Sequence, residues 1–363
     1  MRMIRPPKRV IVESSVAQGQ LVALLRKNLP GATFEIVDEI CENRLHDPDI
    51  LEVADFKGKF LKSCPGTRHY HCCGYMILNF GTQCTLGCSY CILQNYLNQP
   101  NLRLFGNLDN MFSELSDVLT QNHARLHRIG TGEFTDSLLL DPFTELSRLL
   151  VPYFASAPNA VLELKTKTDF VENLLELDHK GHTVVAWSLN SAEIRRSEEP
   201  FTASIEKRLD AARLCAEKGY FLAFHFDPII DYPGWKSGYA KTLEQLFSKV
   251  DPSRIVWISL GALRFMPELK DTLRSRHALS RIAFGEFIRG LDGKMRYFRD
   301  IRSELFSFMV ERIRQADPDL CVYLCMESDD IWKESLGFSP EERGGLGRML
   351  DCALEERMNV RPF

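Results

Sequence analysis

The sequence predicts an α/β protein in which parallel strands are joined by helices. Short apolar runs rich in β-branched and aromatic residues alternate about six times with segments whose apolar residues recur at three- and four-residue spacing. Such alternation favours a parallel sheet, either open or closed into a barrel. Hydrophobic residues make up 45% and charged residues 26% of the 363 residues, which excludes a disordered, collagenous or coiled-coil chain.

The expected elements run in order along the chain. We expect strands at 75–81, 126–130, 160–164, 183–189, 221–226 and 254–260. We expect helices at 110–121, 143–154, 169–177, 204–218 and 239–250. Ahead of them, 10–13, 21–29 and 34–37 indicate one small strand–helix–strand unit. The chain therefore divides into an N-terminal α/β extension (1–70), a core (71–261) and a C-terminal extension, mainly helical with one strand (262–363).

The C-terminal extension carries the one regional charge bias. Residues 262–314 hold twelve basic and seven acidic residues, a net charge of +5 in a chain whose net charge is −4. A bias of this kind indicates either a solvated helical face or a surface that contacts phosphates. The second interpretation predicts that Arg289, Arg296 and Arg299 neutralise the phosphates of a nucleic acid.

The cysteines point to a reducing compartment and to a metal site. Six of the eleven cysteines lie within 28 positions, and such clusters in a chain of this length are more often metal ligands than disulfides. No apolar segment follows the basic N-terminus, so we expect a cytoplasmic protein without an export segment. Residues 72–102 lack charged side chains but contain too many amides for a membrane span, and we expect no membrane association.

Cys84, Cys88 and Cys91 form a CxxxCxxC motif directly after the first predicted core strand. Three thiolates can hold three irons of a [4Fe-4S] cluster and leave the fourth iron open to a small molecule. A structural zinc site is the alternative, although zinc sites more often pair one CxxC with a second, distant pair. Its fourth ligand would be one of His69, His71, Cys72 and Cys73.

This motif resembles that of the radical S-adenosylmethionine (SAM) superfamily, in which SAM binds the open iron and is cleaved to a 5′-deoxyadenosyl radical. Gly130, Gly132 and Glu133 resemble the glycine-rich segment of that superfamily, and Glu133 would accept the ammonium of SAM. Further candidate SAM contacts are polar residues at the predicted carboxyl ends of the third and fourth core strands, where parallel-strand enzymes keep their ligand groups. They are Lys165, Ser188 and Asn190.

Several segments together resemble the spore photoproduct lyase family. They are 68–70, 84–94, 130–142, 186–190, 226–235 and 263–265, which follow the order of that family across about two hundred residues. The resemblance implies a partial (β/α)6 barrel with the cluster at its mouth. It also implies repair of a thymine dimer lesion in DNA by hydrogen abstraction and fragmentation. The partners would be DNA that contains a pyrimidine lesion and an electron donor such as flavodoxin or ferredoxin.

Two departures from the family concern the radical relay. The family cysteine that returns a hydrogen atom to the product matches Glu133 here, and the second of two tyrosines after the cluster motif matches Ile92, while Tyr90 matches the first. The candidate for the missing thiol is Cys325, because it ends the apolar run 320–324, which would be a further parallel strand. The alternative is a packed core cysteine without a chemical role, which would leave Tyr90 or a donor from outside the chain. Cys72 and Cys73 should lie roughly 26 Å from the cluster end of the barrel if the intervening chain is an extended strand.

The sequence therefore favours a radical SAM carbon–carbon lyase with Tyr90 and Cys325 as catalytic residues. The first alternative is a radical SAM enzyme of the same family with another substrate. The second is a zinc-stabilised nucleic-acid-binding protein.

Overall fold

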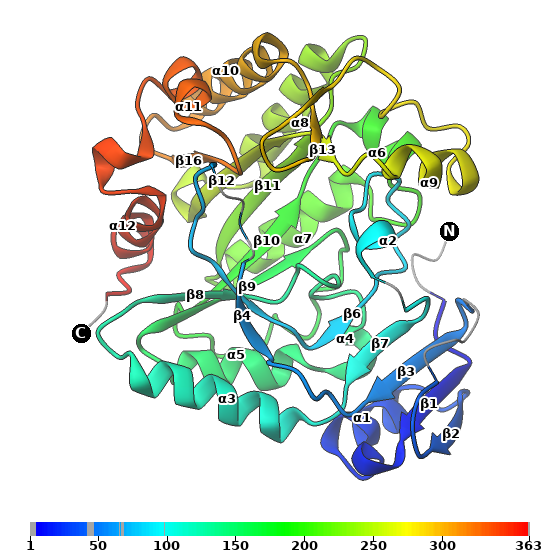
Figure 1. Cartoon of the computed structure of the whole chain (residues 1–363). Helices are drawn as coiled ribbons and strands as arrows, with labels where there is room; N and C mark the ends of the chain where they lie inside the picture. Colours follow the sequence, from blue (N-terminus) through cyan, green and yellow to red (C-terminus); the bar gives the residue numbers. More distant parts are fainter. Residues whose placement is uncertain (1–4, 42–46, 65, 67–68, 98, 362–363) are drawn as a thin grey trace.

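A computed structural model describes residues 5–41, 47–64, 66, 69–97 and 99–361. Its centre is a curled sheet of eight strands in the order β16–β12–β11–β10–β9–β8–β5–β4, parallel except for the β4–β5 pair (Figure 1). The strands are β4 (Leu61–Ser63), β5 (Met76–Leu78), β8 (His127–Gly130), β9 (Ala160–Thr166), β10 (Thr183–Ser188), β11 (Phe221–Ile229), β12 (Ile255–Ala262) and β16 (Cys321–Leu324). The α/β class and the parallel core expected from the sequence are confirmed.

The first predicted core strand was wrong in its extent. The run 75–81 is divided between β5 of the curled sheet and β6 (Gly81–Thr82), which pairs with a second sheet. The division falls at Asn79, whose amide donates to the Phe60 carbonyl at 2.8 Å. The chain therefore leaves the curled sheet just before the cysteine motif.

The second sheet has five strands in the order β2–β1–β3–β7–β6. Its strands are β1 (Arg9–Glu13), β2 (Thr33–Val37), β3 (Ile50–Ala54), β6 and β7 (Leu102–Phe105), and α1 (Gln20–Asn28) connects the first two. The predicted N-terminal strand–helix–strand unit is thus present, and β6 and β7 extend its sheet (Figure 1).

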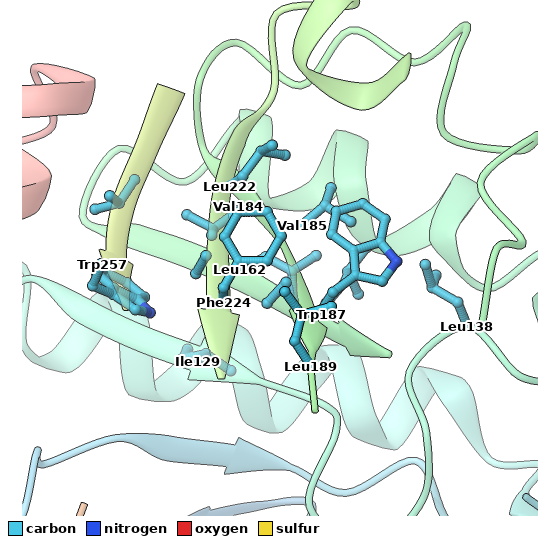
Figure 2. Packing of buried hydrophobic residues seen from close by; sticks show 14 of the residues in the cluster. Ile129, Leu138, Leu162, Val184, Val185, Trp187, Leu189, Leu222, Phe224 and Trp257 are labelled. Carbon is cyan, nitrogen blue, oxygen red and sulfur yellow. The ribbon is translucent and has the colours of Figure 1, made fainter. Parts of the chain in front are cut away.

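Helices cover one face of the curled sheet and leave the other face for polar residues. Side chains alternate between the faces of a strand, so Leu162, Leu222 and Phe224 pack with Val185 and Trp187 in the buried core (Figure 2). The helices between the core strands are α3 (Leu108–Gln121), α4 (Asp141–Thr144), α5 (Ser147–Ala155), α6 (Ala192–Glu198), α7 (Ile205–Glu217) and α8 (Trp235–Lys249).

The predicted helix at 169–177 was wrong. This segment forms consecutive turns, in which Leu174 N donates to the Val171 carbonyl at 2.8 Å and Leu177 N to the Leu174 carbonyl at 3.1 Å. These bonds span three residues, whereas an α-helix requires four. Val171 and Leu174 are nevertheless buried. The turns therefore bury the apolar residues whose spacing had suggested a helix.

The C-terminal part adds helices, a small antiparallel sheet and one strand of the core. Its elements are β13 (Arg264–Phe265), α9 (Leu269–Arg276), β14 (Ile288–Arg289), β15 (Met295–Arg296), α10 (Arg299–Ala316), β16, α11 (Asp329–Leu336) and α12 (Leu346–Met358). β16 pairs in parallel with β12, with Leu324 opposite Leu260, as the sequence predicted for 320–324. Among the described residues, no helix has the length and apolarity needed to cross a membrane.

Candidate functional site

The three motif cysteines lie together in the loop between β6 and the short helix α2 (Leu93–Tyr96). Cys84, Cys88 and Cys91 share a small apolar cluster with Leu86 and Leu139. Leu139 belongs to the segment that follows the glycine-rich turn after β8. The cysteine loop thus packs against the segment that follows the carboxyl end of β8, at the end of the sheet where the resemblance to the family implied the cluster.

Gln94 holds the cysteine loop in its conformation. Its side-chain amide donates to the carbonyls of Cys88 at 3.1 Å and Ser89 at 3.0 Å, and lies 3.4 Å from the carbonyl of Cys91. Its amide oxygen is 2.9 Å from Nε2 of His277. Gln94 therefore fixes the backbone at two of the three cysteines, a role that the motif spacing did not indicate.

A buried ionic network anchors Tyr90 beside the cysteines. The Tyr90 hydroxyl donates to Glu199, which also accepts from Arg208 at 2.5 Å and lies 3.4 Å from the Lys167 ammonium. Glu199 and Arg208 are both 0% exposed. Burial alone would raise the pKa of Glu199, but Lys167 and Arg208 hold that pKa below its usual range. Tyr90 is thereby fixed above the ends of β9 and β10.

The cysteine loop carries the ligands that a [4Fe-4S] cluster requires. Such a cluster takes each of three thiolates at a different iron. Three thiols in one apolar cluster, without a carboxylate among its members, match the soft ligands that such clusters prefer.

Gly130, the last residue of β8, and Gly132, just after it, allow neighbouring side chains to approach the backbone closely. A Cβ at Gly130 would lie 1.4 Å from the Tyr75 hydroxyl, and a Cβ at Gly132 would lie 2.8 Å from the Lys165 Cβ. Any side chain at either position would displace these neighbours. Their predicted contact with SAM stays a prediction.

Glu133 and Lys165 form an ion pair at the carboxyl ends of β8 and β9. The Glu133 side chain is 34% exposed and that of Lys165 is 20% exposed, so the pair is accessible from outside. Burial would lower the pKa of Lys165, but the charges of Glu133 and Glu163 raise it above its usual value. Glu133 can therefore bind an ammonium group of a ligand, and Lys165 can bind a carboxylate group.

Ser188 and Asn190 lie at the end of β10, where their side chains are buried. The amide of Asn190 is already used within the protein, because it donates to the Pro228 carbonyl at 3.0 Å and accepts from the Tyr239 hydroxyl at 2.6 Å. The Ser188 carbonyl accepts from Arg208 at 2.6 Å. The structure thus gives Asn190 a role in the fold, and the role of both residues toward SAM stays a prediction.

A polar cavity lies on the concave face of the curled sheet. Charged pairs line it, with His225 Nε2 at 2.5 Å from Glu163 and Arg264 at 3.0 Å from Asp227. All four side chains face the cavity. His225 and Asp227 are two residues apart in the otherwise apolar strand β11, and Glu163 and Lys165 are two residues apart in β9. This spacing is the sequence pattern that could have revealed the residues on the two strands. The remaining lining residues are Cys64, Cys73, Tyr75, Arg128, Glu133, Lys165, Trp257, Ser259, Tyr323, Cys325, Met326 and Leu350.

Cys325 lies where the sequence predicted, because it follows β16 and lines the cavity together with Glu133 and Lys165. Cys73 lines the same cavity. Its expected separation of roughly 26 Å from the cluster end assumed one straight strand from 75 to 81, whereas the chain leaves the curled sheet after β5. The remoteness of Cys73 from the cluster cysteines stays a prediction. Tyr90 is not among the residues that line the cavity.

The basic C-terminal region is not a continuous cationic surface. Arg296 is 2% exposed and pairs with Asp292 at 2.7 Å, while Arg299 pairs with Glu334 on the surface. The prediction that Arg296 neutralises a phosphate was therefore wrong, because its guanidinium is buried against a carboxylate of the protein, whereas the same role for Arg299, which is 53% exposed, stays a prediction. Arg289 is exposed and forms no ion pair with the described residues. Arg68, part of the first segment that resembles the family, lies outside the described residues.

Comparisons with known proteins agree with this geometry. The family model "Spore photoproduct lyase" matches residues 69–315. Spore photoproduct lyase of Geobacillus sp. (strain Y412MC61) is 27% identical over 208 residues, which cover 56% of this chain and 61% of that protein. The Bacillus subtilis (strain 168) enzyme is 25% identical over 210 residues, covering 57% and 61%. The match thus spans about six-tenths of the length of these relatives.

Solved structures share the fold over most of the chain. A spore photoproduct lyase mutant with bound AdoMet and dinucleoside spore photoproduct superimposes with a TM-score of 0.78 at 24% identity, covering 88% of this chain and 98% of that chain. A spore photoproduct lyase complexed with dinucleoside spore photoproduct gives a TM-score of 0.77 with the same identity and coverage. The family model covers well over half of the chain, and the curled sheet with its cysteine loop is the shared fold. The chain belongs to the spore photoproduct lyase family.

Proposed function

We propose that this protein is a radical SAM lyase that repairs a thymine dimer lesion in DNA. Family membership supports the reaction class, and the lesion bound in two of the similar solved structures supports the substrate. When bound together, a [4Fe-4S] cluster and SAM supply a 5′-deoxyadenosyl radical. Cys84, Cys88 and Cys91 would hold the cluster.

The single observation that carries the proposal is the position of the cysteine loop over the ends of three core strands. Leu139, after β8, shares the apolar cluster of the cysteines. The Lys167 ammonium, after β9, lies 5.6 Å from the centre of the Tyr90 ring. The Ser89 amide donates at 2.9 Å to the carbonyl of Glu198, which ends α6 after β10. In parallel-strand enzymes the reacting groups lie at these carboxyl ends.

The residues of this chain would bind and orient the two ligands. Glu133 and Lys165 offer opposite charges to the amino and carboxylate groups of SAM, and each would exchange its present partner for a ligand group. The lesion would occupy the neighbouring cavity, after leaving the base stack at a cost of about a few kcal/mol. A one-electron donor such as flavodoxin or ferredoxin would reduce the cluster. All eleven cysteines are free thiols, which supports a reducing, cytoplasmic setting.

Substrate-dependent turnover tests this proposal. The protein, reconstituted with iron and sulfide, is incubated with dithionite and SAM, with and without the dinucleoside lesion. We expect the lesion to be converted to its thymine dinucleoside, and Cys88→Ala to abolish both this conversion and SAM cleavage. SAM cleavage that proceeds while the lesion stays intact would contradict the proposed substrate.

The second candidate function is a radical SAM enzyme of the same family with a different substrate. The observation that favours it is the Glu133–Lys165 ion pair, because the resemblance to the family matches Glu133 to the hydrogen-donating cysteine. Under this alternative the lesion would neither bind nor stimulate SAM cleavage. The same incubation therefore separates the two candidates.

A further inference from the structure

The cavity contains a thiol held by a buried ion pair. Cys325 donates a hydrogen bond to the Asp227 carboxylate, and its Sγ lies 3.4 Å from Nη2 of Arg264. Arg264 in turn donates to both Asp227 oxygens, each at 3.0 Å. A Cβ at Gly261 would lie 2.6 Å from the Asp227 carboxyl carbon, so the glycine permits this close arrangement. The position of the thiol is thus fixed by neighbours from β11, β12 and β13.

The surroundings keep this thiol protonated. Burial raises the pKa of Cys325 to about 12, against the opposing effect of Arg264, and Asp227 acts in the same direction as burial. Only a protonated thiol carries a hydrogen atom that it can donate. Cys325 therefore stands in the donor form across the neutral pH range.

The cavity also contains buried polar atoms that lack a partner. Neither the Tyr75 hydroxyl nor the Trp257 indole nitrogen has a hydrogen-bond partner among the described residues, and both side chains line the cavity beside Cys325. Tyr75 is 9% exposed and Trp257 is 3% exposed. A buried polar group without a partner costs about 1–3 kcal/mol, which a polar ligand in the cavity would recover. These atoms indicate that a ligand with hydrogen-bonding groups occupies the space next to the thiol.

We propose that Cys325 donates the hydrogen atom that ends the repair reaction. The inference rests on the proposed function, in which fragmentation of the lesion leaves a carbon-centred radical on the thymine product. The S–H bond of Cys325 breaks homolytically, a C–H bond forms on the product, and the unpaired electron moves to the sulfur. One electron from the reductant that serves the cluster and one proton from water then restore the thiol.

The other candidates near the site suit this role less well. Glu133 is ion-paired to Lys165, and a carboxylate has no hydrogen atom to donate. The Tyr90 hydroxyl is bound to Glu199 outside the cavity. Cys73 lines the cavity, but its thiol interacts with Cys72, and the Arg128 guanidinium donates to the Cys73 carbonyl and not to the thiol. Cys73 is thus the matched control for Cys325.

Deuterium transfer from solvent tests the proposal, because thiol hydrogens exchange with water. The reaction is run in D2O with the wild type, Cys325→Ala, Cys325→Ser and Cys73→Ala, and the thymine product is examined by mass spectrometry. We expect solvent deuterium in the product of the wild type and of Cys73→Ala. Both Cys325 variants should lose that label and divert the product radical to adducts, while iron content stays at the wild-type level, because Cys325 is not one of the cluster cysteines.

A second readout needs neither cluster nor turnover. Hydroxyl radicals, which oxidise a protonated thiol, label the cysteines of the cluster-free protein, and peptide mass spectrometry measures each cysteine separately. We expect the dinucleoside lesion to protect Cys325 and to leave Cys352 unaffected. Equal labelling of Cys325 with and without the lesion would overturn the proposal that this thiol faces the substrate.

The outcomes separate the inference from the proposed function. A wild type that repairs the lesion while Cys325→Ala keeps both the deuterium label and the product ratio overturns the inference alone. Loss of the label only in Cys73→Ala also overturns it and assigns the role to Cys73. A wild type that cleaves SAM but forms no repaired dinucleoside overturns the proposed function and the inference together.

Discussion

Replacing Glu199 with glutamine removes the centre of the network that anchors the cysteine loop. Its carboxylate accepts hydrogen bonds from Arg208 and Tyr90 and lies 3.4 Å from the Lys167 ammonium. A neutral amide at this position would leave the Arg208 guanidinium, which is 0% exposed, without a counter-charge. The Glu199→Gln substitution should therefore weaken both the fold and the anchoring of the cysteine loop.

The expected loss of stability follows from this burial. Removal of one partner of a buried ion pair destabilises a protein by about 3–5 kcal/mol, because the remaining charge is desolvated and uncompensated. Tyr90→Phe is the matched control, since it removes one hydrogen bond to a charged group and keeps the ion pair, at about 1.5–3 kcal/mol. We therefore expect Glu199→Gln to lower the free energy of unfolding more than Tyr90→Phe does.

Urea unfolding of the cluster-free protein, followed by circular dichroism, measures both variants against the wild type. The pKa of Glu199 is lowered in the folded protein, so its stabilising effect is complete above the usual value of 4.5 and declines as the pH falls below it. The difference between wild type and Glu199→Gln should therefore shrink on the acid side of that value. A Glu199→Gln protein within about 0.5 kcal/mol of the wild type at neutral pH would refute this reasoning.

Four further variants test the geometry. Alanine at any of the three cluster cysteines should abolish iron retention and SAM cleavage, whereas Cys215→Ala, in the apolar core, should keep both; iron analysis and 5′-deoxyadenosine formation check this. Gly130→Ala should destabilise the fold by about 1–3 kcal/mol in urea unfolding, because the new methyl group would lie 1.4 Å from the Tyr75 hydroxyl. If Arg289 contacts a DNA phosphate, Arg289→Ala should reduce the salt slope of DNA affinity by about 0.9, an effect absent if the side chain is merely solvated. Arg296→Ala should instead lower the free energy of unfolding, because Arg296 is buried against Asp292.

The sequence predicted the parallel core because its strands are continuous apolar runs separated by amphipathic helices. It did not predict the division of the first run between two sheets. Both halves are apolar, and the division follows from long-range pairing, in which β5 pairs with β4 and β8 while β6 pairs with β7, and no local pattern contains these contacts. The segment 169–177 likewise has helical spacing but forms turns.

The parts of the candidate site that lie close together in the sequence could be predicted, and the parts that lie far apart could not. The cysteine motif lies within eight residues, so its spacing alone indicated the metal site. Tyr90 and Glu199 are 109 positions apart, and Arg264 and Cys325 are 61 apart, and only the curled sheet brings them together. The charge bias of the C-terminal region misled for the same reason, since composition cannot show which arginines are paired inside the fold.

The fate of the dinucleoside spore photoproduct, in a time course with the reconstituted protein, SAM and dithionite, tests the proposed repair activity most directly. We expect the lesion to disappear as an equal amount of thymine dinucleoside forms, and we expect omission of SAM or replacement of Cys84 by alanine to prevent both changes. An intact lesion in the presence of sustained SAM cleavage would contradict the proposed repair activity and direct attention to another substrate for this cavity.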